Sequence, residues 1–140
     1  MLLRRFILSL GLALLAGGAA MAHSYKLGLI EIGHPWMTPV ADGTGIVNMA
    51  LANNGPEPDY LIGAATPIGT AAIQDAQNRP VDEIALPPAK PVALRDGAFH
   101  IGISRISTPL QAGASVPLTL HFAKAGDVAV TVTVEKSPSE

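Results

Sequence analysis

The sequence contains no cysteine among its 140 residues. This absence excludes a disulfide-bonded scaffold, a zinc site built on thiolates and a cysteine nucleophile. Aromatic residues are scarce, at 4%, and charged residues make up only 14% of the chain. Apolar residues nevertheless reach 49%. The composition is therefore that of one folded domain rather than of a disordered segment.

Basic residues are also few, and no run of them follows Arg4 and Arg5. With a formal net charge of −2, the chain lacks the electrostatic footprint of a nucleic-acid-binding protein. It also lacks a glycine-rich phosphate loop, a G-x-S-x-G nucleophile turn and a paired-carboxylate signature. We therefore expect neither nucleic-acid binding nor catalysis.

Residues 1–22 have the pattern of a secretory signal peptide. Arg4 and Arg5 precede a largely apolar run at 6–15, and small residues follow up to Ala20-Met21-Ala22. This run is shorter than the ~20 residues that a membrane-spanning helix needs. We expect cleavage after Ala22, export to the periplasm and no stable membrane insertion of the mature chain. The alternative is an uncleaved amino-terminal anchor.

Alternation of apolar and polar residues predicts strands in the remaining chain. Valine occupies every second position of 128–134, and residues 99–104 and 118–122 alternate in the same way. Further strands are expected at 26–32, 46–52, 60–65, 70–75 and 91–94. Turn signals rich in Gly, Pro and Asn separate them. The pattern predicts an all-β fold, a cupredoxin-like or Ig-like antiparallel β-sandwich over 23–136 with a frayed tail at 137–140.

Four histidines are candidates for chemistry: His23, His34, His100 and His121. His100 and His121 lie opposite the apolar positions of their predicted strands, so their side chains are expected to face solvent, as ordinary surface histidines or as metal ligands. His23 becomes the first residue after cleavage, where its α-amine and ring Nδ1 can chelate one ion, preferably Cu(II). His34 precedes Pro35, which favours an extended backbone and a packing or capping role.

A series of short motifs runs along nearly the whole predicted domain. They are His23-Ser24-Tyr25-Lys26-Leu27-Gly28, Ile30-Glu31-Ile32, His34-Pro35-Trp36, Asn53-Asn54-Gly55, Arg79-Pro80-Val81-Asp82, Gly97-Ala98-Phe99-His100-Ile101, Pro109-Leu110, Val116-Pro117-Leu118-Thr119-Leu120-His121-Phe122 and Lys124-Ala125-Gly126. In order and spacing the sequence resembles the PCu(A)C family of periplasmic copper chaperones. The resemblance implies a cupredoxin-like sandwich that delivers Cu(I) to the CuA centre of cytochrome c oxidase or buffers copper. It also implies that the oxidase or its copper-delivery factors are the partners.

The resemblance carries over only part of the copper site. The family binds copper with two histidines and two methionines, and the corresponding positions here are Gln74, Asn78, His100 and Gly102. His100 alone keeps the ligand. Amide oxygens are poor ligands for the soft Cu(I) ion, which takes thioether and imidazole. A Cu(I) site of the family type is therefore not expected.

Three functions fit these observations. The first is an exported copper chaperone with an altered site, in which His23 binds Cu(II) together with His100 or His121. The second is a periplasmic structural or partner-binding sandwich that has lost the copper ligands. The third is an oxidative enzyme built on an amino-terminal histidine, which the few aromatics and the lack of further obvious ligands disfavour. We expect the first.

Overall fold

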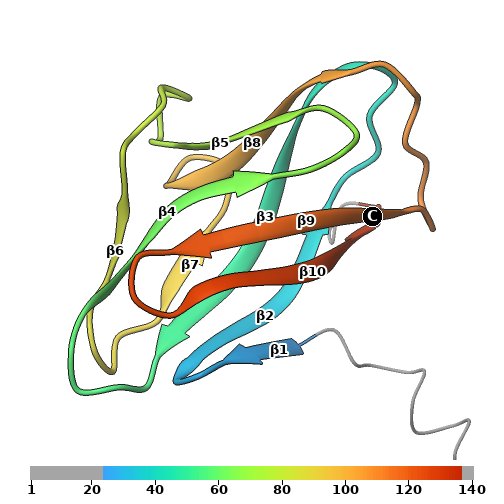
Figure 1. Cartoon of the computed structure of the whole chain (residues 1–140). Coiled ribbons are helices and arrows are strands. Elements are labelled where there is room, and N and C mark those ends of the chain that lie inside the picture. The colour runs from blue at the N-terminus through green and yellow to red at the C-terminus, as the bar shows by residue number, and fades with distance from the viewer. Residues whose placement is uncertain (1–23, 137–140) are drawn as a thin grey trace, which may run out of the picture.

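The computed structural model describes residues 24–136, so the expected signal peptide, His23 and the tail lie outside the described part. The described chain is all-β, as predicted (Figure 1). In this part, no helix has the length and apolarity that crossing a membrane requires. The strands are β1 (Ser24–Leu27), β2 (Ile30–Met37), β3 (Gly43–Asn53), β4 (Asp59–Ala65), β5 (Thr70–Gln74), β6 (Ile84–Leu86), β7 (Val92–Leu94), β8 (His100–Ile106), β9 (Ser115–Phe122) and β10 (Gly126–Val134).

The strands form two packed layers, with β9 and β10 crossing in front of β3 and β7 in Figure 1. Neighbours follow the order β5-β8-β3-β2-β10-β9-β4-β6, while β1 pairs with β2 and β7 with β3. β3 belongs to both layers, because its first half pairs with β8 and its second half with β2 and β7. β10 and β2 pair in parallel, whereas the other strand pairs are antiparallel. The predicted sandwich is confirmed.

Alternate side chains of the long strands fill the space between the layers. The inward positions of β10 include Val130, Val132 and Val134, which are all buried. The period of two in the sequence therefore marks the core face of this strand. Met37 and Met49 are also buried among these apolar residues. Their thioethers pack in the core, away from the positions that the resemblance assigns to copper ligands.

The prediction of one strand over 26–32 is wrong. Gly28 and Leu29 form a tight turn, and β1 and β2 pair as a hairpin that starts at Leu27↔Ile30. Gly28 has φ +60°, a conformation that costs glycine little and that two-residue hairpins require. The alternation of apolar residues continues through this turn. The sequence pattern therefore gives no sign that the chain reverses direction here.

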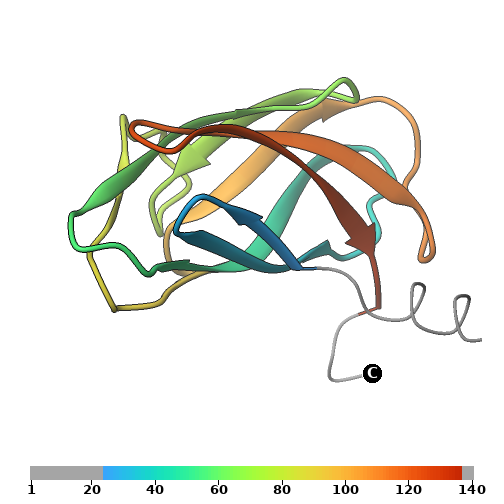
Figure 2. The same ribbon diagram turned by 60° about the horizontal axis from the view of Figure 1, so that its bottom comes forward.

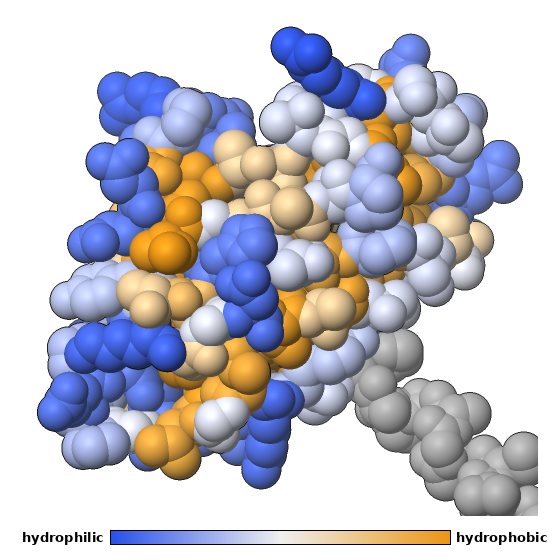
Figure 3. All heavy atoms as spheres, viewed as in Figure 1, coloured by the Kyte–Doolittle hydropathy of each residue, from blue (hydrophilic) through white to orange (hydrophobic). Residues whose placement is uncertain are grey.

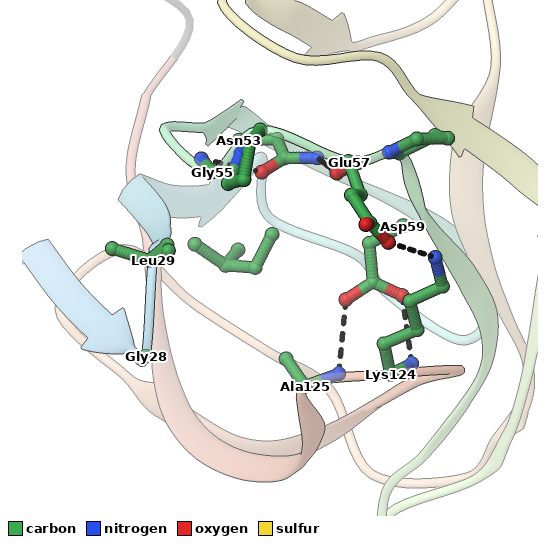
Figure 4. Close-up of a pocket in the computed structure, with 11 residues that line it drawn as sticks. Gly28, Leu29, Asn53, Gly55, Glu57, Asp59, Lys124 and Ala125 are labelled. Carbon is green, nitrogen blue, oxygen red and sulfur yellow. Dashed lines mark hydrogen bonds and ion pairs between the residues drawn. The ribbon is translucent and has the colours of Figure 1, made fainter.

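Asp59 joins the start of β4 to the turn between β9 and β10. Its buried carboxylate accepts hydrogen bonds from the backbone N–H groups of Tyr60 and Lys124 at Oδ1 and of Ala125 at Oδ2, with distances of 2.8, 2.8 and 2.9 Å. A buried carboxylate without such donors would be costly. These bonds therefore hold the turn against β4, as Figure 4 shows for Lys124 and Ala125.

We predict that Asp59→Ala lowers the free energy of unfolding by about 3 kcal/mol, because the turn N–H groups of Lys124 and Ala125 lose their buried acceptor. Urea denaturation measures the loss. The exposed Asp42 supplies the control, since Asp42→Ala should change stability by no more than about 0.5 kcal/mol. Equal losses for the two variants would contradict the anchoring role of Asp59.

Candidate functional site

His100 begins β8 and faces the interior. Its side chain is 0% exposed, whereas Phe99 is 43% exposed, so the prediction that His100 faces solvent is wrong. β8 lies between β5 and β3, and its first four residues are all buried. A strand that is covered on both faces has no solvent side for alternation to reveal.

Both ring nitrogens of His100 have a partner. Nδ1 lies 2.8 Å from the carbonyl oxygen of Ala98, and Nε2 lies 3.0 Å from Oε1 of Gln74. A carbonyl oxygen only accepts, so Nδ1 carries the proton and donates it to Ala98. The side-chain amide of Gln74 is the hydrogen-bond partner of Nε2, and an amide can either accept from or donate to a ring nitrogen. The nitrogen that a metal would take is therefore already used.

Gln74 also fills the space above Gly102. The register of β5 and β8 places Gln74 opposite His100 and Ala72 opposite Gly102. A Cβ atom added at Gly102 would lie 2.8 Å from Cδ of Gln74, closer than real side chains approach. The Gln74 side chain thus occupies the volume that a methionine at 102 would need.

Asn78 belongs to the tight turn that follows β5. It is exposed and has φ +64°, in the left-handed region that asparagine tolerates. The carboxylate of Asp75 accepts N–H hydrogen bonds from Arg79 at 3.0 Å and Gln77 at 2.9 Å. These bonds, that of Arg79 foremost, hold the pKa of Asp75 below its ordinary value. The residue at this family position therefore shapes a turn.

The residues at the positions that the resemblance assigns to copper do not fit a Cu(I) ion. They offer one imidazole and no thioether, and the Gln74 amide takes both the imidazole nitrogen and the free volume. Nor do residues 24–136 contain a group of three or more His, Cys, Asp or Glu side chains placed to hold a metal. The arrangement is a satisfied polar pair inside the sandwich.

The two other described histidines lie elsewhere. His121 is half-buried on the outer face of β9, as predicted, with Nδ1 2.9 Å from Oδ1 of Asp127. His34 does not have the extended backbone expected before proline, because its φ is +41° within an irregular register between Gly33 and Trp36. The structure does not bring His100 and His121 together, since one is buried in β8 and the other lies on the outside of β9.

Sequence reasoning missed a cavity of about 390 Å³ near the turn between β1 and β2 (Figure 4). Leu29 forms part of its wall, and Glu57 and Lys124 pair across 3.5 Å at its rim. Asn53 donates to the carbonyl oxygens of Glu57 and Leu86 and accepts from the N–H of Gly55. Because these polar groups already bind one another, they support the loop between β3 and β4. Only the Asn-Asn-Gly turn signal pointed to this region.

This two-layer strand arrangement is that of a PCuAC domain. The chain belongs to the LpqE-like family, whose description names the lipoprotein LpqE and whose model matches residues 30–134. The predicted resemblance is confirmed at the level of family and fold. No curated protein sequence matches the chain.

Solved structures of PCuAC domains are similar over most of the chain. The apo PCuAC domain from PmoF1 has a TM-score of 0.76 and 28% identity, covering 82% of this chain and 100% of that one. The copper-bound PCuAC domain from PmoF2 has a TM-score of 0.74 and 30% identity, covering 82% and 99%. The Cu(I) form of DR1885 from Deinococcus radiodurans, at 21% identity, covers 88% and 87% and shares the fold, with a TM-score of 0.66.

The contact between Gln74 and Gly102 leads to a test by double-mutant cycle. We predict that Gly102→Ala lowers the free energy of unfolding by about 2 kcal/mol, because the added methyl group meets the Gln74 amide. In a Gln74→Ala background the same change should cost much less. Urea denaturation of the four proteins measures the coupling.

Gly63→Ala is the matched control for this cycle. A Cβ atom there would lie 3.5 Å from Cδ2 of His121, an ordinary van der Waals contact. We expect the Gly63→Ala change to cost the same in both backgrounds. An equal cost of Gly102→Ala in both backgrounds would show that Gln74 does not fill this space.

Proposed function

We propose that this protein is an exported, periplasmic copper-handling protein of the PCuAC type with an altered metal site. It binds Cu(II) through histidine nitrogens and delivers or buffers copper. The observation that carries the proposal is the 30% identity to the copper-bound PCuAC domain from PmoF2 over 82% of the chain. The family match over residues 30–134 supports it.

The donor set of this chain favours Cu(II) over Cu(I). Met37 and Met49 are buried in the hydrophobic core, and the positions of the family's methionines hold Asn78 and Gly102. Imidazole, amine and carboxylate donors remain, and these suit Cu(II) best among the common divalent ions. We propose a copper-binding domain with no catalytic role.

The three ligands predicted from the sequence differ in what they require. His23 supplies an amine and an imidazole once the signal peptide has been removed after Ala22. His121 is accessible on the outer face of β9, where its ring is paired with Asp127. His100 becomes a ligand only if Gln74 turns away from Nε2, at the cost of a partly buried hydrogen bond.

The proposed recipients of copper are cytochrome c oxidase or its copper-delivery factors. The support is the resemblance of the motifs to periplasmic copper chaperones, together with the family match. A transient copper donor needs no obligate interface, since weak encounters suffice for transfer between partners.

One observation favours a second function, that of a partner-binding sandwich without metal. Gln74 satisfies His100 and fills the space above Gly102, so the interior is complete without an ion. A satisfied, partly buried polar pair stabilises a single packing arrangement. In this case the fold would be retained for contacts with another protein.

A competition titration separates the two functions. Mature protein, confirmed by mass to begin at His23, is titrated with Cu(II) and with Cu(I) against chelators of known affinity. We expect one equivalent of Cu(II) to bind and no stoichiometric binding of Cu(I), because no thioether is accessible.

Failure to bind either ion would favour the second function. Tight binding of Cu(I) would contradict the altered site, because it would require His100 to leave Gln74. The titration of a His100→Ala variant identifies that case, since only an ion bound at His100 would be lost.

A further inference from the structure

A cavity of about 360 Å³ opens at the end of β2, and none of the proposed copper ligands lines it. Its lining includes Trp36, Asn48 and Asp96. These residues come from three separate segments, which are the end of β2, the middle of β3 and the turn between β7 and β8. Cavities of this size, lined by a few polar groups among apolar ones, are the usual setting of small-molecule sites.

The cavity lies where β2 and β3 separate. Their pairing ends at Trp36↔Asn48, after a register shift between Gly33 and Trp36. From there β2 continues beside β10, whereas residues 43–47 of β3 pair with β8 in the other layer. Figure 2 shows the connection between β2 and β3 as an open loop at one end of the molecule. The diverging strands thus form the walls of a crevice, and irregular pairing of this kind is frequent beside functional sites.

Trp36, the only tryptophan in the sequence, is half-buried in the wall of this cavity. Its carbonyl oxygen accepts a hydrogen bond from Nδ2 of Asn48 at 3.2 Å. On its other side, it lies opposite Thr133 of β10. The backbone of Trp36 is therefore held by both neighbouring strands. A half-buried indole keeps part of its ring surface accessible, and tryptophan is the side chain that attracts cations most strongly through its π face.

Asp96 is the one charged residue that lines the cavity. It is exposed and belongs to the turn between β7 and β8. Hydrogen bonds of 3.0 Å close this turn, from the N–H of Arg95 to the carbonyl oxygen of Phe99 and from the N–H of Ala98 to that of Arg95. Within residues 24–136, Asp96 takes part in no ion pair. A fixed turn therefore presents an unpaired carboxylate at the cavity.

The rest of the lining is mainly apolar. It consists of four apolar or small residues and two threonines: Pro39, Val40, Gly45, Ile46, Thr38 and Thr44. A single carboxylate provides too few donors for a metal ion such as Ca²⁺, which takes six to eight oxygens. An ammonium group that carries N–H donors would need several acceptors in such surroundings. A cation covered by methyl groups needs none, so the apolar wall favours a quaternary ammonium group.

We propose that this cavity binds a trimethylammonium group. The indole of Trp36 attracts the methylated cation, and the carboxylate of Asp96 balances its charge. Both a free compound such as choline and the choline headgroup of a phospholipid carry this group. Binding is reversible and breaks no covalent bond. The site is independent of the proposed copper function, because the two share no residue.

The test titrates the purified protein with choline chloride and follows the fluorescence of Trp36, which reports on the cavity directly. Sodium chloride keeps the ionic strength constant, so that only the organic cation changes. We expect a saturable change in fluorescence. The neutral isostere of choline, in which a tert-butyl group replaces the trimethylammonium group, has the same shape without the charge. It should bind at least about fivefold more weakly, because it loses both the cation–π attraction and the attraction to the carboxylate.

Two variants separate the two contributions. Asp96→Asn removes the charge and should weaken choline binding at least about threefold. Trp36→Leu keeps an apolar side chain without the π face and should weaken it about fivefold, measured by ligand-observed NMR because the fluorophore is gone. Asp82→Asn is the matched control, since Asp82 is exposed and lies outside the cavity lining. Urea unfolding checks that each variant folds, and Asp96→Asn alone decides the question if Trp36→Leu does not fold.

Three results would overturn the site. They are no saturable binding of choline, equal binding of choline and its neutral isostere, and equal choline affinity in Asp96→Asn and Asp82→Asn. None of them bears on the copper titration, so the two proposals fail separately.

Sedimentation with lipid vesicles identifies the source of the bound group. Cosedimentation with phosphatidylcholine vesicles but not with phosphatidylglycerol vesicles, reversed by free choline, would assign the site to a lipid headgroup. Binding of choline without such cosedimentation would assign it to a free compound.

Discussion

The edge of β2 is shared by two strands, and much of the molecule depends on this arrangement. β1 pairs antiparallel with its first half and β10 pairs parallel with its end, while β3 takes the opposite edge. The last strand of the domain thereby returns to the first hairpin and completes one side of the sandwich. Because backbone hydrogen-bonding groups at a strand edge need partners, this sharing also brings the two ends of the domain together.

The interior of the sandwich accommodates a histidine whose two ring nitrogens both have hydrogen-bond partners. His100 and Gln74 come from neighbouring strands and satisfy each other, and Gly102 leaves room for the amide. Within residues 24–136, no buried side-chain nitrogen or oxygen lacks a hydrogen-bond partner. Since each unsatisfied buried group would cost stability, the hydrogen bonds of His100 support the arrangement of the surrounding strands.

The surface mixes hydrophobic and hydrophilic residues, unlike the largely apolar interior. Figure 3 shows hydrophobic residues in bands between hydrophilic ones on the face that carries β4, β9 and β10. Leu29, Ile62 and Phe99 are large hydrophobic residues that remain exposed. Exposed apolar groups of this kind are common on soluble domains when they are dispersed.

The alternation of apolar and polar residues predicted strands correctly where one face of a strand meets the core and the other meets solvent. It located β9 and β10 and the all-β class, because side chains on such strands point alternately inward and outward. It failed at 26–32, where Gly28 turns the chain without interrupting the pattern. It also failed for His100, because β5 and β3 flank β8 and its start is buried on both faces.

The sequence by itself determined the all-β class and the family, and it places no methionine at the positions that the resemblance assigns to copper, since these follow from residue types in a fixed order. Only the tertiary structure decided what surrounds His100, because Gln74 and His100 meet through strand pairing across 26 positions. The same holds for His34 and Glu135, which lie far apart in the chain and meet where β10 joins β2. Contacts between distant positions depend on register, which no local pattern encodes.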